Sequence, residues 1–156
     1  MKHRTASTIP VIVLLAGFVV CPATLQAKDH KKCSIESTAG DWAFTDIGSV
    51  IGVGPFAAIG TFTLDGEGSV VGEQTNSVGG NVARLTFSGT YTVNDDCAGV
   101  AAIDVFDLSG NKVRTSDLDL VFDDSVREMR AIFTSIVLQP SGVNLQSVIT
   151  LEAKRK

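Results

Sequence analysis

Charged residues within otherwise apolar stretches are the first candidates for chemistry in this sequence. Asp104 lies in the stretch VAAIDVFDL, with Phe106 on its own face of a strand and Ile103 on the other. A carboxylate among apolar neighbours can line a cavity, have a raised pKa and exchange protons near neutral pH. Arg84 and Arg130 are cationic counterparts that could anchor a carboxylate ligand. For all three, the alternative is a solvent-facing position on the polar side of a strand.

Other carboxylates occur in pairs. Asp117 and Asp119 are two residues apart, so in a strand they share a face and could form half of an acid–base pair or of a calcium site. The acidic pairs in DGEG (65–68) and NDDCAG (94–99) fall in turns, where Asp is common because it bonds the following backbone. Neither turn matches the 12-residue EF-hand spacing. We interpret these carboxylates as outer-face or turn residues and expect no metal site.

Nucleophilic catalysis needs a base beside a serine or cysteine. Beyond residue 27 the sequence has a single histidine, His30, in a polar segment, which argues against Ser/His/Asp and Cys/His chemistry. Each glycine cluster joins two predicted strands and none opens a helix, so no phosphate-binding loop is expected. We nominate no catalytic residue, expect no cofactor and favour a non-enzymatic role.

Residues 1–27 have the pattern of a secretory signal peptide. The basic start KHR is followed by the apolar run IPVIVLLAGFVV at 9–20, which is shorter than the roughly 20 residues that span a bilayer. Small residues then lead to a cleavage site after Ala27, with Ala23 as the alternative. An uncleaved anchor and lipidation at Cys21 are the less favoured interpretations. We expect an exported protein, periplasmic or secreted, with no membrane span in the mature chain.

Export would leave Cys33 and Cys97 in an oxidising compartment, where an even pair usually forms a disulfide. We predict that this bridge holds a polar N-terminal lead-in, residues 28–39, against a hairpin end at 94–99. Two free buried thiols are the alternative. The pair lacks the ligand spacing of a zinc site.

The charge balance argues against nucleic acid as a partner. The chain has 13 basic and 17 acidic residues, a net charge of −4, and loss of the basic leader makes the remainder more acidic. The short basic runs KDHKK and KRK are typical of solvated tails. We expect a monomer whose partner is a small hydrophobic molecule.

Residues 40–156 are predicted to form one all-β domain. Threonine and valine are frequent, no helical period follows residue 40, and short polar clusters mark turns. The stretch DIGSVIGVGPF, residues 46–56, is predicted to be a loop or lid because of its glycines and Pro55. The eight predicted strands lie at 40–45, 57–64, 69–76, 82–93, 99–106, 112–122, 126–137 and 144–153.

Alternation predicts how these strands assemble. In VARLTFSGTYTV, residues 82–93, Leu85, Phe87 and Tyr91 share one face and the threonines share the other, as in an antiparallel sheet with one polar side. Eight successive strands leave two exposed edges unless the sheet closes. We predict an eight-stranded antiparallel up-and-down barrel, with a two-sheet β-sandwich as the alternative. An outer-membrane barrel is less favoured, because one Trp and one Tyr cannot form aromatic girdles.

The stretch AAIGTFTLDGEGSVVGEQT (57–75) followed by FSGTYTVNDDCAG (87–99) resembles a group of small secreted bacterial proteins of unassigned function. Their shared pattern is a strand of the type GTFTFDG.G and then a strand reading GTYTVN.DC.G. The resemblance covers about residues 57–107 and implies a calycin-like barrel, similar to that of allene oxide cyclase. Calycin barrels often hold small apolar ligands, and allene oxide cyclase folds a fatty-acid epoxide into a ring. None of its functional residues matches a position here.

We therefore expect a small apolar ligand in the barrel mouth. Phe87 and Tyr91 would flank Gly89, whose missing side chain would leave space, and Asp104 and Phe106 are the remaining candidate ligand-binding residues. An isomerase or cyclase of the allene-oxide-cyclase type, and a structural or surface interaction module with a filled core, are the alternatives. A roomy apolar cavity favours binding, a cavity with a buried carboxylate favours an enzyme, and one below roughly 300 Å³ favours the structural role.

Overall fold

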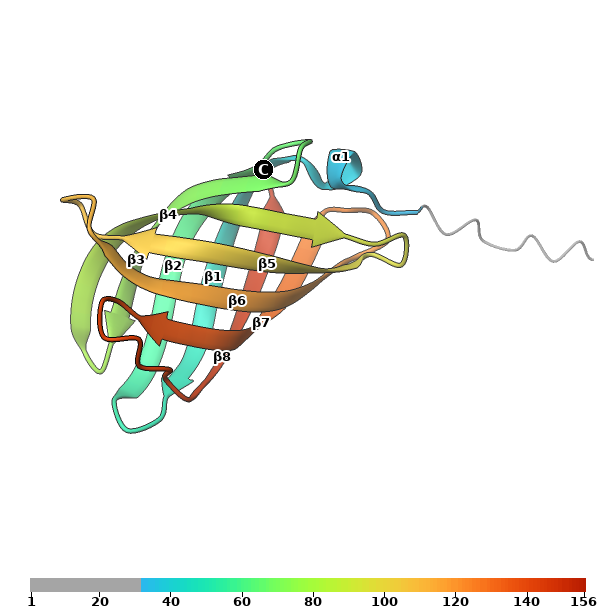
Figure 1. Ribbon diagram of the computed structural model, residues 1–156. Helices are drawn as coiled ribbons and strands as arrows, with labels where there is room; N and C mark the ends of the chain where they lie inside the picture. The colour runs from blue at the N-terminus through green and yellow to red at the C-terminus, as the bar shows by residue number, and fades with distance from the viewer. Residues whose placement is uncertain (1–31) are drawn as a thin grey trace, which may run out of the picture.

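The computed structural model describes residues 32–156, which form a closed barrel of eight antiparallel strands in chain order (Figure 1). This confirms the predicted barrel over the sandwich. The predicted signal peptide and residues 28–31 of the lead-in lie outside the described residues, so the domain limits stay a prediction. The elements are α1 (Ile35–Thr38), β1 (Gly40–Val50), β2 (Gly54–Leu64), β3 (Ser69–Val78), β4 (Asn81–Val93), β5 (Ala98–Phe106), β6 (Lys112–Phe122), β7 (Glu128–Leu138) and β8 (Ser147–Arg155).

The predicted loop or lid at 46–56 is wrong. β1 continues to Val50, a turn follows at 51–53, and β2 begins at Gly54. Burial alternates through this stretch, with Asp46 buried and Ile47 exposed, as in any strand with one inward face. Pro55 is tolerated because it lies at the start of a strand, where a missing N–H costs little.

The last strand begins later than predicted, at Ser147. The chain at 139–146 instead folds back on β7, where the Leu145 N–H donates to the Ile136 carbonyl oxygen at 2.8 Å. Pairing between β7 and β8 accordingly covers only Glu128–Ile132 on the β7 side.

Inward-facing glycines let neighbouring strands approach each other closely. A Cβ placed on any of five strand glycines would lie 2.0 to 2.5 Å from a carbonyl oxygen of the adjacent strand, so no side chain fits there. Such positions allow the sheet to curve into a small barrel. They are Gly48, Gly60, Gly72, Gly89 and Gly99.

The described part of the lead-in, residues 32–39 with α1, lies at one end of the barrel (Figure 1). The predicted disulfide is confirmed: Cys33 is bonded to Cys97, with their Cα atoms 4.9 Å apart. Helix α1 begins with a capping box, in which the Ser34 and Ser37 side chains each accept a bond from the other's backbone N–H. The bridge therefore ties the lead-in to the β4–β5 hairpin end, as the sequence predicts.

Aromatic side chains fill the barrel beneath α1. Trp42 is fully buried, stacks on Phe62 with ring centroids 6.2 Å apart, and meets Phe122 edge-on at 5.5 Å. Its Nε1 donates to the Thr38 carbonyl oxygen at 3.2 Å, which joins α1 to the core. The end of the barrel under α1 is thus tightly closed.

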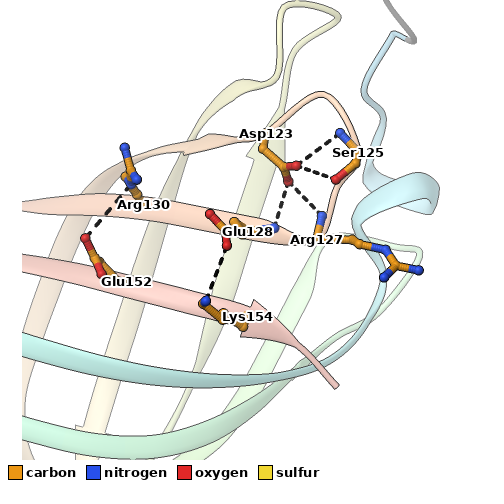
Figure 2. Close-up of polar contacts among 7 residues, drawn as sticks. All are labelled: Asp123, Ser125, Arg127, Glu128, Arg130, Glu152 and Lys154. Atoms are coloured by element: carbon orange, nitrogen blue, oxygen red, sulfur yellow. Dashed lines mark hydrogen bonds and ion pairs between the residues drawn. The ribbon is translucent and has the colours of Figure 1, made fainter.

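Polar contacts on the outside hold the β6–β7 turn and the β7–β8 pair (Figure 2). The Asp123 carboxylate accepts bonds from the backbone N–H groups of Ser125, Arg127 and Glu128. Desolvation opposes ionisation of Asp123, but the hydrogen bond from the Ser125 hydroxyl, together with these backbone bonds, outweighs it and lowers the pKa of Asp123 to about 2. Lys154 pairs with Glu128 across β7 and β8 at 3.4 Å. These contacts position the turn and are remote from the barrel interior.

Candidate ligand cavity

A small cavity lies inside the barrel. Its volume is about 50 Å³, which is far below the roughly 300–1,000 Å³ of pockets for drug-sized ligands. It has room for a few water molecules, since one needs roughly 10–15 Å³. Its walls are almost entirely apolar, with two polar exceptions, Asp46 and Gln74. The aromatic residues of the lining are Phe44, Phe62, Phe87, Tyr91 and Phe133.

Two of the ligand-binding residues predicted from the sequence face this cavity. Phe87 and Tyr91 on β4 both line it and are both buried. Gly89, between them, does not line it. A Cβ on Gly89 would lie 2.0 Å from the Ala102 carbonyl oxygen, so the backbone of β5 occupies the space that was expected to admit a ligand. Gly89 therefore allows β4 and β5 to lie close together and does not create space for a ligand.

Asp104 and Phe106 lie away from the cavity. Asp104 is on the outer face of β5, where it accepts hydrogen bonds from Thr115 Oγ1 at 2.8 Å and Lys112 Nζ at 3.2 Å. The bond from Thr115, followed by the effect of Lys112, holds the pKa of Asp104 below its usual range. Phe106 is half-buried at the end of β5, where the pairing with β6 shifts after Val105. Alternation explains both positions, because the inward face of β5 carries Ile103 and Val105.

The remaining candidates also lie outside. Arg130 approaches Glu152 at 4.0 Å on the outer face (Figure 2), and Arg84 is exposed. Asp117 and Asp119 are exposed on β6. Within residues 32–156, no group of three or more histidine, cysteine or acidic side chains is placed to hold a metal ion. In the same part of the chain, no helix has the length and apolarity needed to cross a membrane.

Asp46 is the functional candidate that the sequence interpretation missed. It is 1% exposed, lines the cavity, and neither carboxyl oxygen has a hydrogen-bond partner in the described protein. Burial raises the pKa of Asp46 to about 7, against the opposing effect of Arg114. The signal was present in DWAFTDIGSV, where Trp42, Phe44 and Asp46 alternate onto one face. This pattern was not used for Asp46 because residues 46–56 were predicted to be a loop.

Further buried polar groups accompany Asp46. Gln74 lines the cavity with an unpartnered Nε2, and Ser116 is fully buried with an unpartnered Oγ. Arg114 is 7% exposed, and its Nε and Nη2 atoms also lack partners. Burial lowers the pKa of Arg114 below its ordinary value, while the carboxyl of Asp46 raises it in part. The period-two pattern in KVRTSDLDLVF places Arg114 on the inward face with Leu118 and Leu120, so this position was also readable in principle.

The arrangement combines an apolar wall with a few unsatisfied polar groups. A carboxyl with a pKa near 7 can accept or donate a hydrogen bond, and can exchange a proton, at neutral pH. Gln74 Nε2 adds a donor to the same cavity. Pockets for small molecules combine apolar walls with a few polar groups in the same way, although they are larger than this cavity.

No family model matches this sequence, and no curated protein matches it. Solved structures are similar in fold. The chain resembles EF1p2_mFAP2b bound to DFHBI with a TM-score of 0.56 and 10% identity, over 79% of this chain and 97% of that one. It resembles the redesigned β-barrel mFAP1 bound to DFHBI with a TM-score of 0.51 and 13% identity, over 78% and 98%. At these identities the likeness shows the β-barrel fold alone.

Proposed function

We propose that this protein is an exported, monomeric barrel that binds a small, largely apolar molecule in its interior, with Asp46 and Gln74 as polar contacts. One observation carries the proposal: a buried carboxyl without a hydrogen-bond partner faces a cavity whose walls are almost entirely apolar. Burying a polar group without a hydrogen bond costs roughly 1–3 kcal/mol by mutational measures. Perturbed, buried ionisable groups of this kind concentrate at functional sites.

The size of the cavity limits the ligand. At about 50 Å³ it admits only a few heavy atoms, so a larger molecule requires the lining side chains to move. Met129 belongs to this lining, and methionine adapts to new shapes because it is unbranched and has several rotatable bonds. A filled structural core, with ordered water on Asp46, is the competing function that the small volume favours.

Two further observations support the proposal. The similar structures named above are barrels bound to a small molecule, DFHBI, which supports an interior that can hold a ligand. The Cys33–Cys97 bridge supports an oxidising compartment and hence export, since disulfides are rare in the cytosol.

A second candidate function is proton-transfer catalysis, an isomerase or cyclase reaction on a small apolar substrate. It is favoured by a specific observation, namely the pKa of about 7 at Asp46, which is matched to a general base or acid at neutral pH. Binding remains the first candidate because the other ionisable group in the lining, Tyr91, has a pKa raised by burial and a hydroxyl that already donates to the Asp65 carbonyl oxygen.

The binding function can be tested by titrating the isotope-labelled, disulfide-bonded protein with 1-hexanol and following backbone amide shifts. Saturable shifts centred on Asp46, Phe87 and Tyr91 are expected. Ala131→Leu should weaken binding about tenfold or more, because Ala131 lines the cavity and a larger side chain fills it.

Thr150→Leu, on the exposed face of β8, is the matched control and should bind as the wild type does. If Ala131→Leu fails to fold, Ala101→Val makes the same change more gently at another lining position. Absence of saturable binding by the wild type, or undiminished binding by the filled variants, would contradict the proposal and favour the filled core.

A further inference from the structure

Arg114 presents an unused edge inside the barrel. Its Nε and Nη2 are buried and have no hydrogen-bond partner, and its guanidinium lies 5.7 Å from the centroid of the Phe56 ring. Nε and Nη2 lie on the same side of the planar guanidinium, so their N–H groups point in parallel. Packing against Phe56 restricts the plane of the group. The result is a two-pronged donor held in a fixed orientation.

This edge is not satisfied by the acid that shares the barrel interior. Asp46 and Arg114 influence each other electrostatically, but both Asp46 oxygens are unpartnered, so no hydrogen bond joins the two residues. A guanidinium stays protonated in proteins and is costly to bury without an acceptor. The chemical complement of two parallel N–H donors is a group with two coplanar oxygens, a carboxylate above all.

We propose that Arg114 is the head-group site for a small apolar monocarboxylic acid, whose carboxylate accepts from Nε and Nη2 and whose apolar body lies in the cavity lined by Phe44 and Phe87. The proposal rests on the proposed binding function and names its ligand class. Arg114 does not itself line this cavity, and Asp46 is the link between the two, because it lines the cavity and interacts electrostatically with Arg114. Ser116 Oγ, unpartnered and two residues along the inward face of β6, offers an additional donor.

The state of Asp46 decides how well an anion is held. A neutral Asp46 can donate a hydrogen bond to a carboxylate, whereas an ionised one repels it. The buried polar residues of the described chain include no other carboxyl group, and Tyr91 lies at the opposite end, where its hydroxyl bonds the Asp65 carbonyl. Lys112 and Asp104 pair with each other on the outer face. Because burial raises the pKa of Asp46 to about 7, carboxylate binding should weaken as the pH rises through 7.

The experiment compares hexanoate with 1-hexanol, which share a chain length and differ in the head group. Both are titrated into the full-length, disulfide-bonded protein at pH 6 and pH 8 and followed by calorimetry and amide shifts. At pH 6 the wild type should bind hexanoate about tenfold more tightly than hexanol. Arg114→Gln should remove this preference and leave hexanol binding within about twofold. Arg114→Lys, which keeps a charge but lacks the two-pronged edge, should restore the preference only in part.

Asp46→Asn tests separately whether the protonation of Asp46 controls carboxylate binding. It should abolish the pH dependence of hexanoate binding, whereas a merely structural residue would leave that dependence unchanged. If the wild type binds hexanol as tightly as hexanoate, or Arg114→Gln keeps the preference, the carboxylate site is overturned and the binding function stands. If neither hexanoate nor hexanol binds, the carboxylate site and the proposed binding function are both overturned, and the buried polar groups hold water only. If Arg114→Gln does not fold, the Arg114→Lys comparison and the pH dependence decide.

Discussion

Asp46 and Arg114 lie inside the same barrel and shift each other's ionisation, yet no hydrogen bond joins them. An acid and a base that stabilised the fold by pairing would share short contacts with their lone pairs and protons satisfied. Here both oxygens of Asp46, and Nε and Nη2 of Arg114, have no hydrogen-bond partner. Asp46 and Arg114 therefore do not form a hydrogen-bonded structural ion pair, which agrees with the carboxylate site proposed above.

The burial of Asp46 predicts a pH-dependent stability. Unfolded Asp46 loses its proton near pH 4 and the folded residue near pH 7, so between these values the unfolded chain binds fewer protons. The free energy of unfolding should therefore fall as the pH rises from about 4 to about 7, and then level off. The contribution of Asp46 to this fall is at most about 4 kcal/mol, at roughly 1.4 kcal/mol per pKa unit.

Asp46→Asn should accordingly be more stable than the wild type at pH 8, and the difference should shrink towards pH 4. Urea denaturation followed by tryptophan fluorescence at several pH values measures this. Asp119→Asn, on the exposed face of β6, is the matched control and should leave the pH profile unchanged. A wild-type stability that rises between pH 4 and pH 7 in step with Asp46→Asn would contradict the assignment.

The Cys33–Cys97 bridge should contribute strongly to stability. It joins residues 64 positions apart, and the chain-entropy estimate for a loop of this length is about 4 kcal/mol. Cys97→Ala should lower the free energy of unfolding by an amount of that order. The double variant Cys33→Ala/Cys97→Ala should lose no more than the single one, because either change removes the whole bridge. Additive losses, or free alkylation of both thiols without reductant, would show that the bridge does not form.

Tyr91 should hold α1 to the barrel. Its hydroxyl donates to the Asp65 carbonyl oxygen at 2.6 Å and lies 3.2 Å from the Ile35 carbonyl oxygen of α1. Tyr91→Phe keeps the ring and should cost about 1–2 kcal/mol in unfolding free energy, with faster amide exchange in α1. Thr92→Val, the next residue on the exposed face, should change stability by less than about 0.5 kcal/mol. Equal effects of the two variants would rule out the anchoring role.

Gly89 should be intolerant of any side chain. A Cβ there meets the Ala102 carbonyl oxygen at 2.0 Å, and backbone cannot move aside cheaply. Gly89→Ala should therefore lower the melting temperature sharply or prevent soluble expression. Gly66→Ala, in a turn where a Cβ meets nothing within 4 Å, is the matched control and should fold normally. A Gly89→Ala protein with wild-type stability would mean that β4 and β5 are not so close.

The barrel could be predicted from the sequence alone, because local patterns carry that information. Each strand has one apolar face, as alternation in stretches such as 82–93 indicates, and the turns between strands are short and polar. Few arrangements bury the apolar faces of eight such successive strands. A closed barrel is one of them, and closure also removes the two exposed edges. The Cys33–Cys97 pairing followed from counting cysteines, and Phe87 and Tyr91 followed from periodicity within one strand. Each of these inferences needs only the order of residues along the chain.

Which polar side chains lie inside the barrel, and how large its cavity is, could not be predicted before the fold was known. The neighbouring strand determines the surroundings of Asp104 and Gly89. Asp104 pairs with Thr115 of β6 on the outer face, and the β5 backbone fills the space beside Gly89. The register between distant strands brought Asp46, Gln74 and Arg114 into one interior, and no local pattern encodes that register. The burial that sets the pKa of Asp46 arises only when all eight strands have closed around it, because desolvation depends on the whole surrounding protein.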